Sequence, residues 1–153
     1  MNQLIGCCGL DCEICDARIA TFANDEALRE KTAALWTKLN GVTITPDMIT
    51  CTGCRAEGAK TPFCDRLCPV HTCVREKRLD TCADCGQFPC DAPILRSLRM
   101  RVFAAYAREH GEEALLAHLA RKAAQGVLVH RVGLTGDYDG FESEEELIRF
   151  LES

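Results

Sequence analysis

Three stretches of the chain carry apolar residues at the spacing of an amphipathic α-helix. The first covers residues 25–39, with Asn24 or Asp25 placed to cap its start and Asn40-Gly41 placed to end it. Its apolar positions are Leu28, Leu35, Trp36 and Leu39. Because these side chains share one face of a helix, we expect that face, with Trp36, to be buried in a core.

The second and third stretches follow one another and predict a helical hairpin. One runs from about Pro93 to His110-Gly111, and the next runs from Glu112 to Gln125 and stops at Gly126. The apolar positions are Ile94, Leu95, Leu98, Val102, Ala105 and Tyr106, followed by Leu115, Leu116, Leu119 and Ala123. The arginines of the first helix lie largely off its apolar stripe, on a face that we expect to be solvated. They are Arg96, Arg99, Arg101 and Arg108.

One further helix and two short strands complete the expected elements. Ser143 and Glu146 form a capping box at the start of a final helix. Val42–Ile44 and Val127–Val132 have the composition of short strands. The predicted fold is therefore α+β but mainly helical: a cysteine-rich, metal-stabilised module of knuckles and short helices, followed by the helical hairpin, with few and short strands.

Cysteines change this picture more than any other residue type. Eight of the twelve lie between residues 51 and 90, and two pairs there have the spacing Cys-x-x-Cys. These pairs are Cys51 with Cys54 and Cys82 with Cys85. A tight turn of this kind offers two sulfurs to one tetrahedral zinc ion. Gly53 lies inside the first turn, where a positive φ lets backbone amides point at sulfur.

A second cysteine cluster opens the chain. Cys8, Cys12 and Cys15 have the spacing C-x3-C-x2-C. Two interpretations follow. The three thiolates are zinc ligands whose fourth partner lies elsewhere, or they hold a [4Fe-4S] cluster as in radical S-adenosylmethionine enzymes. Such enzymes surround the cluster with a barrel of strands and helices, and the helical residues after Cys15 favour zinc.

We predict eleven cysteines as metal ligands. They are Cys8, Cys12, Cys15, Cys51, Cys54, Cys64, Cys68, Cys73, Cys82, Cys85 and Cys90. Cys7 is the expected spare thiol, because two neighbouring residues rarely point at one ion and Cys8 has the motif around it. His71 lies among the cysteines and is a candidate to replace one of them.

Several pairings of these ligands with two or three zinc ions stay open. In chain order, one set is Cys51, Cys54, Cys64 and Cys68, and the other is Cys73, Cys82, Cys85 and Cys90. A crossed arrangement joins Cys12, Cys15, Cys51 and Cys54, joins Cys68, Cys73, Cys82 and Cys85, and leaves Cys8, Cys64 and Cys90 for a third site. Because Cys8, Cys12 and Cys15 lack a fourth ligand, we expect the stretch from Cys51 to Cys90 to supply it.

The charge distribution bears on nucleic-acid binding. The chain carries a net charge of -5, whereas residues 51–101 contain nine basic and six acidic residues. This excess suggests a basic module that binds nucleic acid. Four thiolates around one zinc carry about two negative charges, however, and nearby cations offset them. We favour charge compensation over nucleic-acid binding.

The remaining composition indicates a compartment and a division into modules. The first residues have neither the basic segment nor the apolar segment of a signal peptide, and no stretch is long enough to span a membrane. We therefore expect a cytoplasmic protein without membrane contact, whose thiols stay reduced and bind metal rather than form disulfides. We expect a cysteine-rich module over residues 1–92 and a helical region over residues 93–153 packed on it.

The cysteine motifs, taken in order, resemble a known family. They are Cys8-Gly9-Leu10-Asp11-Cys12-x-x-Cys15, the helix with Trp36, Cys51-x-Gly53-Cys54, Cys68 to Cys73, Cys82-x-x-Cys85 and Phe88-Pro89-Cys90. This set resembles domain of unknown function 3795, a family of small cysteine-rich proteins from bacteria and archaea. The resemblance covers residues 6–92, and it implies zinc binding and no established reaction.

Taken together, these features predict a structural or interaction module rather than an enzyme. The chain has no glycine-rich phosphate loop, nucleophile elbow or zinc-peptidase helix, and we assign no catalytic residue. Thiolate-dominated zinc sites are usually closed and structural. We expect two or three zinc ions per chain and a protein partner. An iron-sulfur protein is the first alternative and a nucleic-acid-binding zinc module is the second.

Overall fold

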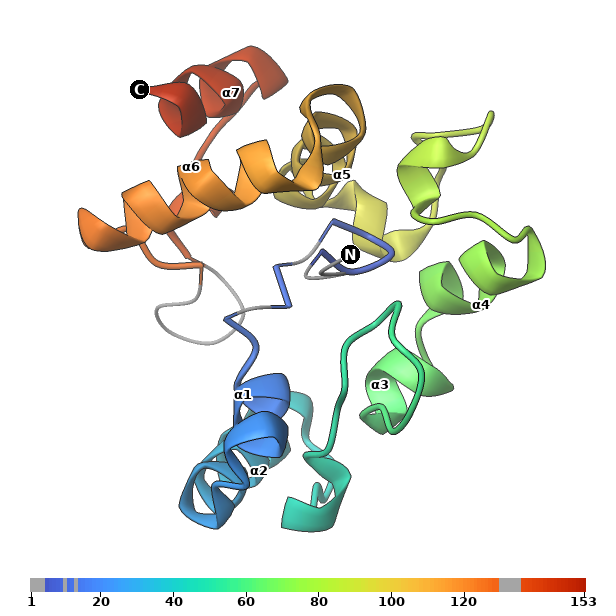
Figure 1. The fold of residues 1–153 in the computed structure, drawn as a ribbon, viewed down its shortest axis with the longest axis vertical. Coiled ribbons are helices and arrows are strands. Elements are labelled where there is room, and N and C mark those ends of the chain that lie inside the picture. Colours follow the sequence, from blue (N-terminus) through green and yellow to red (C-terminus); the bar gives the residue numbers. More distant parts are fainter. Residues whose placement is uncertain (1–4, 10, 13, 130–135) are drawn as a thin grey trace. The chain divides into compact units, whose positions relative to one another are not determined.

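A computed structural model describes residues 5–9, 11–12, 14–129 and 136–153 of the chain (Figure 1). These residues are mainly helical, and among them no strand forms beyond an isolated antiparallel bridge between Ile5 and Asp11. Within the same residues, no helix combines the length and apolarity needed to cross a bilayer. The mainly helical prediction is confirmed, whereas the α+β detail is not.

Contacts divide the chain into two compact units. Unit 1 comprises Met1–Cys7 and Asp11–Asp80, and unit 2 comprises Cys8–Leu10 and Thr81–Ser153. The chain therefore passes from one unit to the other between two adjacent cysteines. Each unit is described by itself below.

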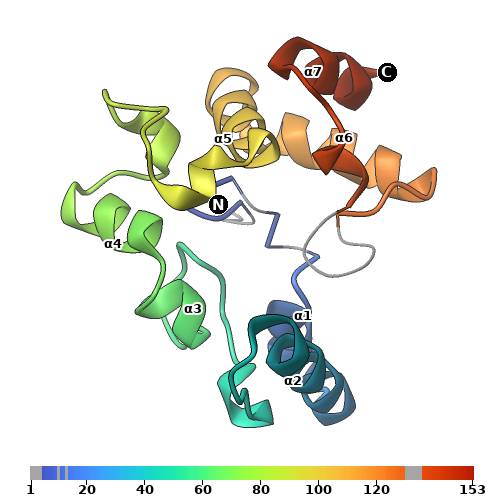
Figure 2. The ribbon, with the colours of Figure 1, turned by 180° about the vertical axis from the view of Figure 1, so that it is seen from behind.

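Unit 1 begins with two helices that lie side by side, α1 (Asp16–Ala23) and α2 (Glu26–Asn40) (Figures 1 and 2). The carboxylate of Asp25 accepts a hydrogen bond of 2.9 Å from the backbone N–H of Leu28, which caps the start of α2. Gly41 ends α2 in the left-handed conformation, with φ at 67°. The helix predicted over residues 25–39 is confirmed at both ends.

One buried cluster of unit 1 combines alanine, isoleucine and cysteine. Its buried members are Ala17, Ala33, Ile44, Ile49 and Cys51, and Cys15, Trp36 and Phe63 pack against them. The rings of Trp36 and Phe63 meet edge to face, with their centroids 6.1 Å apart. Trp36 thus packs on the core as predicted, but Leu35 and Leu39 are exposed. The expected burial of the whole leucine stripe is wrong, because α2 turns Thr32 and Ala33 inward instead.

Short helices and loops make up the rest of unit 1. They are the 3-10 turn η1 (Pro46–Met48), α3 (Pro62–Asp65) and α4 (Pro69–Glu76). The strand predicted at Val42–Ile44 is wrong. The Thr37 hydroxyl accepts from the backbone N–H of Ile44 at 2.8 Å and donates to its carbonyl at 3.2 Å. A side chain therefore satisfies the backbone groups that a neighbouring strand would otherwise pair.

Unit 2 contains the predicted helical hairpin. The 3-10 turns η2 (Cys82–Asp84) and η3 (Pro93–Arg96) lead into α5 (Leu98–His110) and α6 (Glu112–Ala124), which pack on each other. Gly111, with φ at 91°, makes the tight connection between the two helices. The hairpin is confirmed, and Pro93 lies at the start of η3.

Helix α7 (Glu144–Glu152) packs on both α5 and α6. The Ser143 hydroxyl caps it by accepting from the Glu146 N–H at 3.2 Å, as predicted. Before α7, the 3-10 turn η4 (Asp137–Asp139) inserts the buried Tyr138 between Phe103 and Phe150. Unit 2 therefore packs aromatic rings in its core.

The structure overturns two further predictions at residues that contact η4, namely a strand at residues 127–129 and a solvated Arg99. Residues 127–129 form no strand: the Leu128 N–H donates to the Asp137 side chain at 2.8 Å, and its carbonyl accepts from the Asp137 N–H at 2.9 Å. The rest of the strand predicted at Val127–Val132 lies outside the described residues. Arg99 is buried rather than solvated, because its guanidinium lies 3.4 Å from the Asp139 carboxylate.

Candidate metal centre

Five cysteines from three segments of unit 1 form one neighbourhood, which we call the thiol cluster. Its members are Cys12, Cys15, Cys51, Cys54 and Cys64. Cys12 and Cys51 are buried, and the other three are half-buried. All five are reduced thiols in the structure. The cluster joins the N-terminal motif to the beginning of the cysteine-rich stretch.

Local structure directs backbone amides at two of these sulfurs. Cys15 is the N-cap residue of α1, and the N–H groups of Ala17 and Arg18 act to lower the pKa of its thiol. Gly53, whose φ of 117° allows a tight turn, donates its N–H to the Cys51 sulfur at 3.4 Å. The positive φ predicted for Gly53 is confirmed. Amides that point at sulfur stabilise a thiolate, which is the form that binds metal.

The backbone of Cys51 is anchored separately from its sulfur. Its N–H donates to the Thr21 hydroxyl at 2.8 Å, and that hydroxyl donates to the Ala17 carbonyl at 2.7 Å. Thr21 therefore ties the Cys51 segment to α1, the helix that begins at Cys15. This link explains how residues distant in sequence are held together.

Burial governs the electrostatics of Cys12. It raises the pKa of the Cys12 thiol from 9.0 to about 12, while the Cys54 N–H acts in the opposite direction. The neighbouring sulfurs of Cys54, Cys15 and Cys51 raise this pKa further, because thiolates repel one another. A bound cation would replace that repulsion with attraction and favour the thiolate form.

Cys64 belongs to the same electrostatic group from a more distant part of the sequence. Burial raises the pKa of its thiol to about 12, although the Thr61 hydroxyl acts to lower it. Cys54, Cys51 and Cys15 raise it in turn. Cys64 thus lies near Cys15 of the N-terminal motif and near both cysteines of the Cys51 turn.

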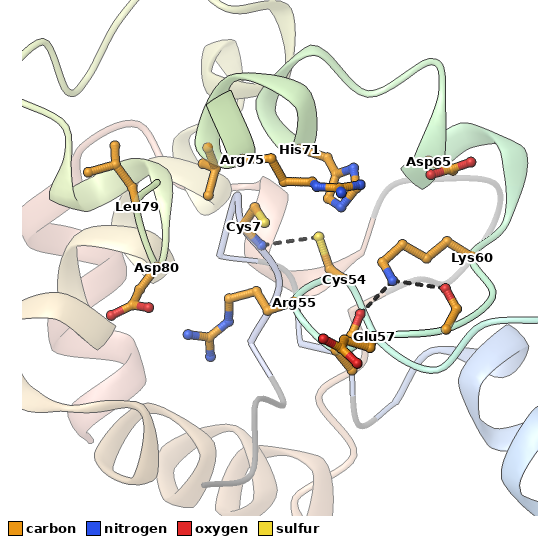
Figure 3. Close-up of a pocket in the computed structure, with 13 residues that line it drawn as sticks. Cys7, Cys54, Arg55, Glu57, Lys60, Asp65, His71, Arg75, Leu79 and Asp80 are labelled. Carbon is orange, nitrogen blue, oxygen red and sulfur yellow. Dashed lines mark hydrogen bonds between the residues drawn. The ribbon is translucent and has the colours of Figure 1, made fainter. Parts of the chain in front are cut away.

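Cys7, the expected spare thiol, lies beside Cys54. Its N–H donates to the Cys54 sulfur at 3.4 Å (Figure 3). A hydrogen bond between the two thiols raises the pKa of Cys54 more than any other cause, ahead of burial. Cys7 is only 2% exposed. This placement was not predicted, and the only sequence signal for it is the adjacency of Cys7 to Cys8.

Cys7 and Cys54 line a cavity of about 370 Å³ in unit 1 (Figure 3). Lys60 also lines it, and its ammonium group donates to the carbonyls of Ala56 at 2.5 Å and Gly58 at 3.2 Å. His71 of α4 contributes its ring, which is 2% exposed and whose Nδ1 has no hydrogen-bond partner among the described residues. Burying an imidazole nitrogen without a hydrogen-bond partner destabilises the folded state. The Nδ1 atom of His71 is therefore suited to bind a ligand in this cavity.

The other predicted ligands are distributed over both units. Cys68 precedes α4 and is half-buried, and Cys73 is exposed on α4. Unit 2 contains the buried Cys8, the half-buried Cys82 and Cys85, and the exposed Cys90. The Cys85 sulfur accepts the N–H of Gln87 at 3.5 Å, the same i to i+2 geometry that Gly53 makes with Cys51.

The donor set of unit 1 has the chemistry that zinc selects, namely several buried thiols with directed amides. Across residues 5–9, 11–12, 14–129 and 136–153, no three His, Cys, Asp or Glu side chains are positioned to hold one metal ion together. The thiols of the cluster lie in one neighbourhood, but three or more of their side chains would have to reorient toward a common point before they could bind one metal ion.

Comparison with known proteins identifies the family. Residues 4–93 match the family model described as "Protein of unknown function (DUF3795)". Because this match covers more than half of the chain, the protein belongs to that family, which confirms the resemblance drawn from the cysteine motifs. Neither the curated proteins nor the solved structures include a significant match.

Proposed function

We propose that this protein is a zinc-binding module in which the thiol cluster of unit 1 holds one structural zinc ion. Cys12, Cys15, Cys51 and Cys54 are its ligands, and Cys64 lies beside them. The observation that carries this proposal is the gathering of two Cys-x-x-Cys turns into one neighbourhood, where the sulfurs of Cys54, Cys15 and Cys51 all raise the pKa of Cys12. Four thiols in two such pairs match a closed tetrahedral site.

The structural role follows from the composition of unit 1. Cysteine itself takes part in the buried packing of this unit, because Cys51 lies in one cluster with Ala17, Ala33, Ile44 and Ile49. Binding of a structural zinc ion contributes roughly 10–16 kcal/mol in small domains, which is enough to order such a unit. Zinc thereby links α1, through Cys15, to the segment around Cys51.

The biological role that suits such a module is interaction with another protein. A closed thiolate site has no open position for a substrate, and we assign no catalytic group. The remaining cysteines allow a second and a third zinc ion, in keeping with two or three per chain. On this proposal the metal ions hold in place the surface that contacts the partner protein.

Cobalt titration of matched variants tests the proposed ligands. Thiolate-to-cobalt charge-transfer absorption reports how many sulfurs bind Co²⁺ in place of Zn²⁺. We expect Cys51→Ala to reduce the thiolate absorption and to lower zinc affinity at least tenfold, because a tetrahedral site loses one of four ligands. Cys73→Ala is the control, since Cys73 is exposed and lies outside the thiol cluster. Unchanged zinc affinity in Cys51→Ala would contradict the proposal.

A further inference from the structure

The cavity beside Cys54 has the size of a binding site for a small organic molecule. Its volume of about 370 Å³ lies at the lower end of the range for ligand pockets and far exceeds the space that one water molecule fills (Figure 3). All the residues that line it belong to unit 1. The chemistry of these residues therefore indicates which kind of molecule fits the cavity.

His71 is the buried polar side chain of this cavity. It is 2% exposed, and its Nδ1 has no hydrogen-bond partner among the described residues. When Nδ1 carries the ring hydrogen, it can donate to an acceptor such as a carboxylate. A ligand acceptor at this position would satisfy a nitrogen that is otherwise buried without a partner.

Two cationic side chains accompany His71 on the cavity lining. Arg75 follows His71 by four residues on α4, so the two side chains share one face of the helix. The Lys60 ammonium group has three N–H groups, of which two donate to the carbonyls of Ala56 and Gly58. Its third N–H remains available to a ligand. These donors together suit a carboxylate group.

Carboxylates balance the cations around the cavity. The lining carries three basic and three acidic side chains, namely Arg55, Lys60 and Arg75, and Glu57, Asp65 and Asp80. The three acidic residues are exposed, whereas the donor His71 is buried. A ligand with negative charge alone would meet these carboxylates, and a ligand with positive charge alone would meet the cations. A molecule that carries both charges can complement both sets.

One of the carboxylates lies near the donors. Asp65, His71 and Arg75 also line a second cavity, of about 350 Å³, so these three residues border both cavities. Asp65 belongs to α3 and the other two belong to α4, and the two helices pack on each other. Val74 and Leu79 add apolar surface to the first cavity. A negative group, several donors and an apolar wall are thus available to one ligand.

We propose that the cavity beside Cys54 binds a zwitterionic molecule of amino-acid size. The carboxylate of this ligand accepts hydrogen bonds from His71 Nδ1 and Lys60, and its ammonium group pairs with Asp65. Val74 and Leu79 contact its aliphatic part. Binding of a small molecule is a function beyond zinc binding, and the two sites adjoin, because Cys54 of the thiol cluster lines the cavity.

Binding of L-leucine and of two analogues tests the class of ligand. Isocaproate lacks the ammonium group of leucine, and isoamylamine lacks its carboxylate. NMR titration of the intact protein, as purified, would measure the three affinities. We expect L-leucine to bind about tenfold or more tightly than either analogue, because each analogue loses the hydrogen bonds of one charged group. Absence of leucine binding, or equal affinity for isocaproate, would overturn the proposal.

Matched substitutions test the assigned residues. The amide nitrogen of asparagine can take the place of imidazole Nδ1, whereas that of glutamine takes the place of Nε2. His71→Gln should therefore weaken leucine binding about tenfold, and His71→Asn should largely retain it. Asp65→Asn should remove the preference for leucine over isocaproate. Asp80→Asn is its control and should keep that preference, because Asp80 lines only the first cavity.

Circular dichroism would verify that each variant is folded. If the two histidine variants bind leucine equally well, Nδ1 does not hold the carboxylate. If the two aspartate variants show the same preference, Asp65 does not hold the ammonium group. Either result contradicts the proposed site, and the aspartate pair keeps the test decisive if a histidine variant does not fold.

Discussion

Gly9 occupies a position that only glycine fits. Its φ of 94° is strained for other residues, and an added Cβ would overlap the backbone of α5. We predict that Gly9→Ala destabilises the protein by about 1–3 kcal/mol from the backbone conformation, with the overlap adding to that loss. Gly86→Ala is the matched control, because a Cβ at Gly86 meets nothing within 4 Å. Urea unfolding would measure both, and equal effects would contradict the close packing of the Cys8 segment.

The buried thiol of Cys12 predicts a pH dependence in the metal-free protein. Its pKa is raised from 9.0 to about 12, so its neutral form is favoured in the folded state. The resulting stability is fully present below pH 9 and is lost as the pH rises from 9 toward 12. Each such thiol contributes a slope of up to about 1.4 kcal/mol per pH unit.

Unfolding by urea at several alkaline pH values, with metal removed, measures this slope. Cys12→Ala should flatten it, because the variant lacks the group whose ionisation opposes folding. A slope unchanged by the substitution would show that other groups cause the loss. Zinc binding should have the opposite pH dependence, since the ligands must lose protons to bind.

At the scale of single residues, the sequence singles out the cysteines but does not show which of them lie together. Cys12, Cys15, Cys51 and Cys54 were among the predicted ligands, and one of the arrangements left open joined these four. Cys7 is the spare thiol on the sequence pattern, because Cys8 has the motif around it, and the structure places Cys7 beside Cys54. Spacing along the chain shows which residues share a turn, whereas unit membership depends on contacts between distant segments.

Helices were predicted well because their signals are local. Asp25 and Gly41 mark the ends of α2, and Ser143 marks the start of α7, through hydrogen bonds within a few residues. The short strands were predicted wrongly, because the backbone groups of those segments form hydrogen bonds with side chains, and hydrophobic periodicity does not indicate such bonds. Thr37 pairs with Ile44 through its hydroxyl, and such a side-chain contact leaves no pattern in the sequence.

Removal of the α2 cap tests how far this helix supports unit 1. We predict that Asp25→Ala lowers the free energy of unfolding by about 0.5–2 kcal/mol, because the Leu28 N–H loses its acceptor. Asp25→Ser retains a capping oxygen and should lose much less. Thermal unfolding followed by circular dichroism would compare the two. Equal losses would show that the carboxylate acts through something other than the cap.

At the scale of the molecule, the two units differ in what stabilises them. Unit 2 buries aromatic side chains such as Phe103 and Tyr138, whereas the buried cluster around Ile49 in unit 1 contains cysteine. The single tryptophan, Trp36, packs against the core of unit 1. Its fluorescence therefore reports on the unit that is expected to depend most on metal.

Chelation should consequently act unequally on two signals. We predict that removal of zinc shifts the emission of Trp36 to longer wavelength, as solvent reaches the ring, and that unit 1 then unfolds at a much lower urea concentration. Part of the helical circular dichroism should remain, because α5, α6 and α7 share an apolar core. Restoring zinc should reverse both changes. Emission that chelation leaves unaltered would contradict a structural metal in unit 1.

The identity and number of bound metal ions test the central claim most directly. The measurement is elemental analysis, with native mass spectrometry, of the intact protein purified without oxygen. We predict two or three zinc ions per chain, with neither iron nor sulfide in stoichiometric amount. Stoichiometric iron with sulfide, or folded protein purified without any bound metal, would contradict this prediction.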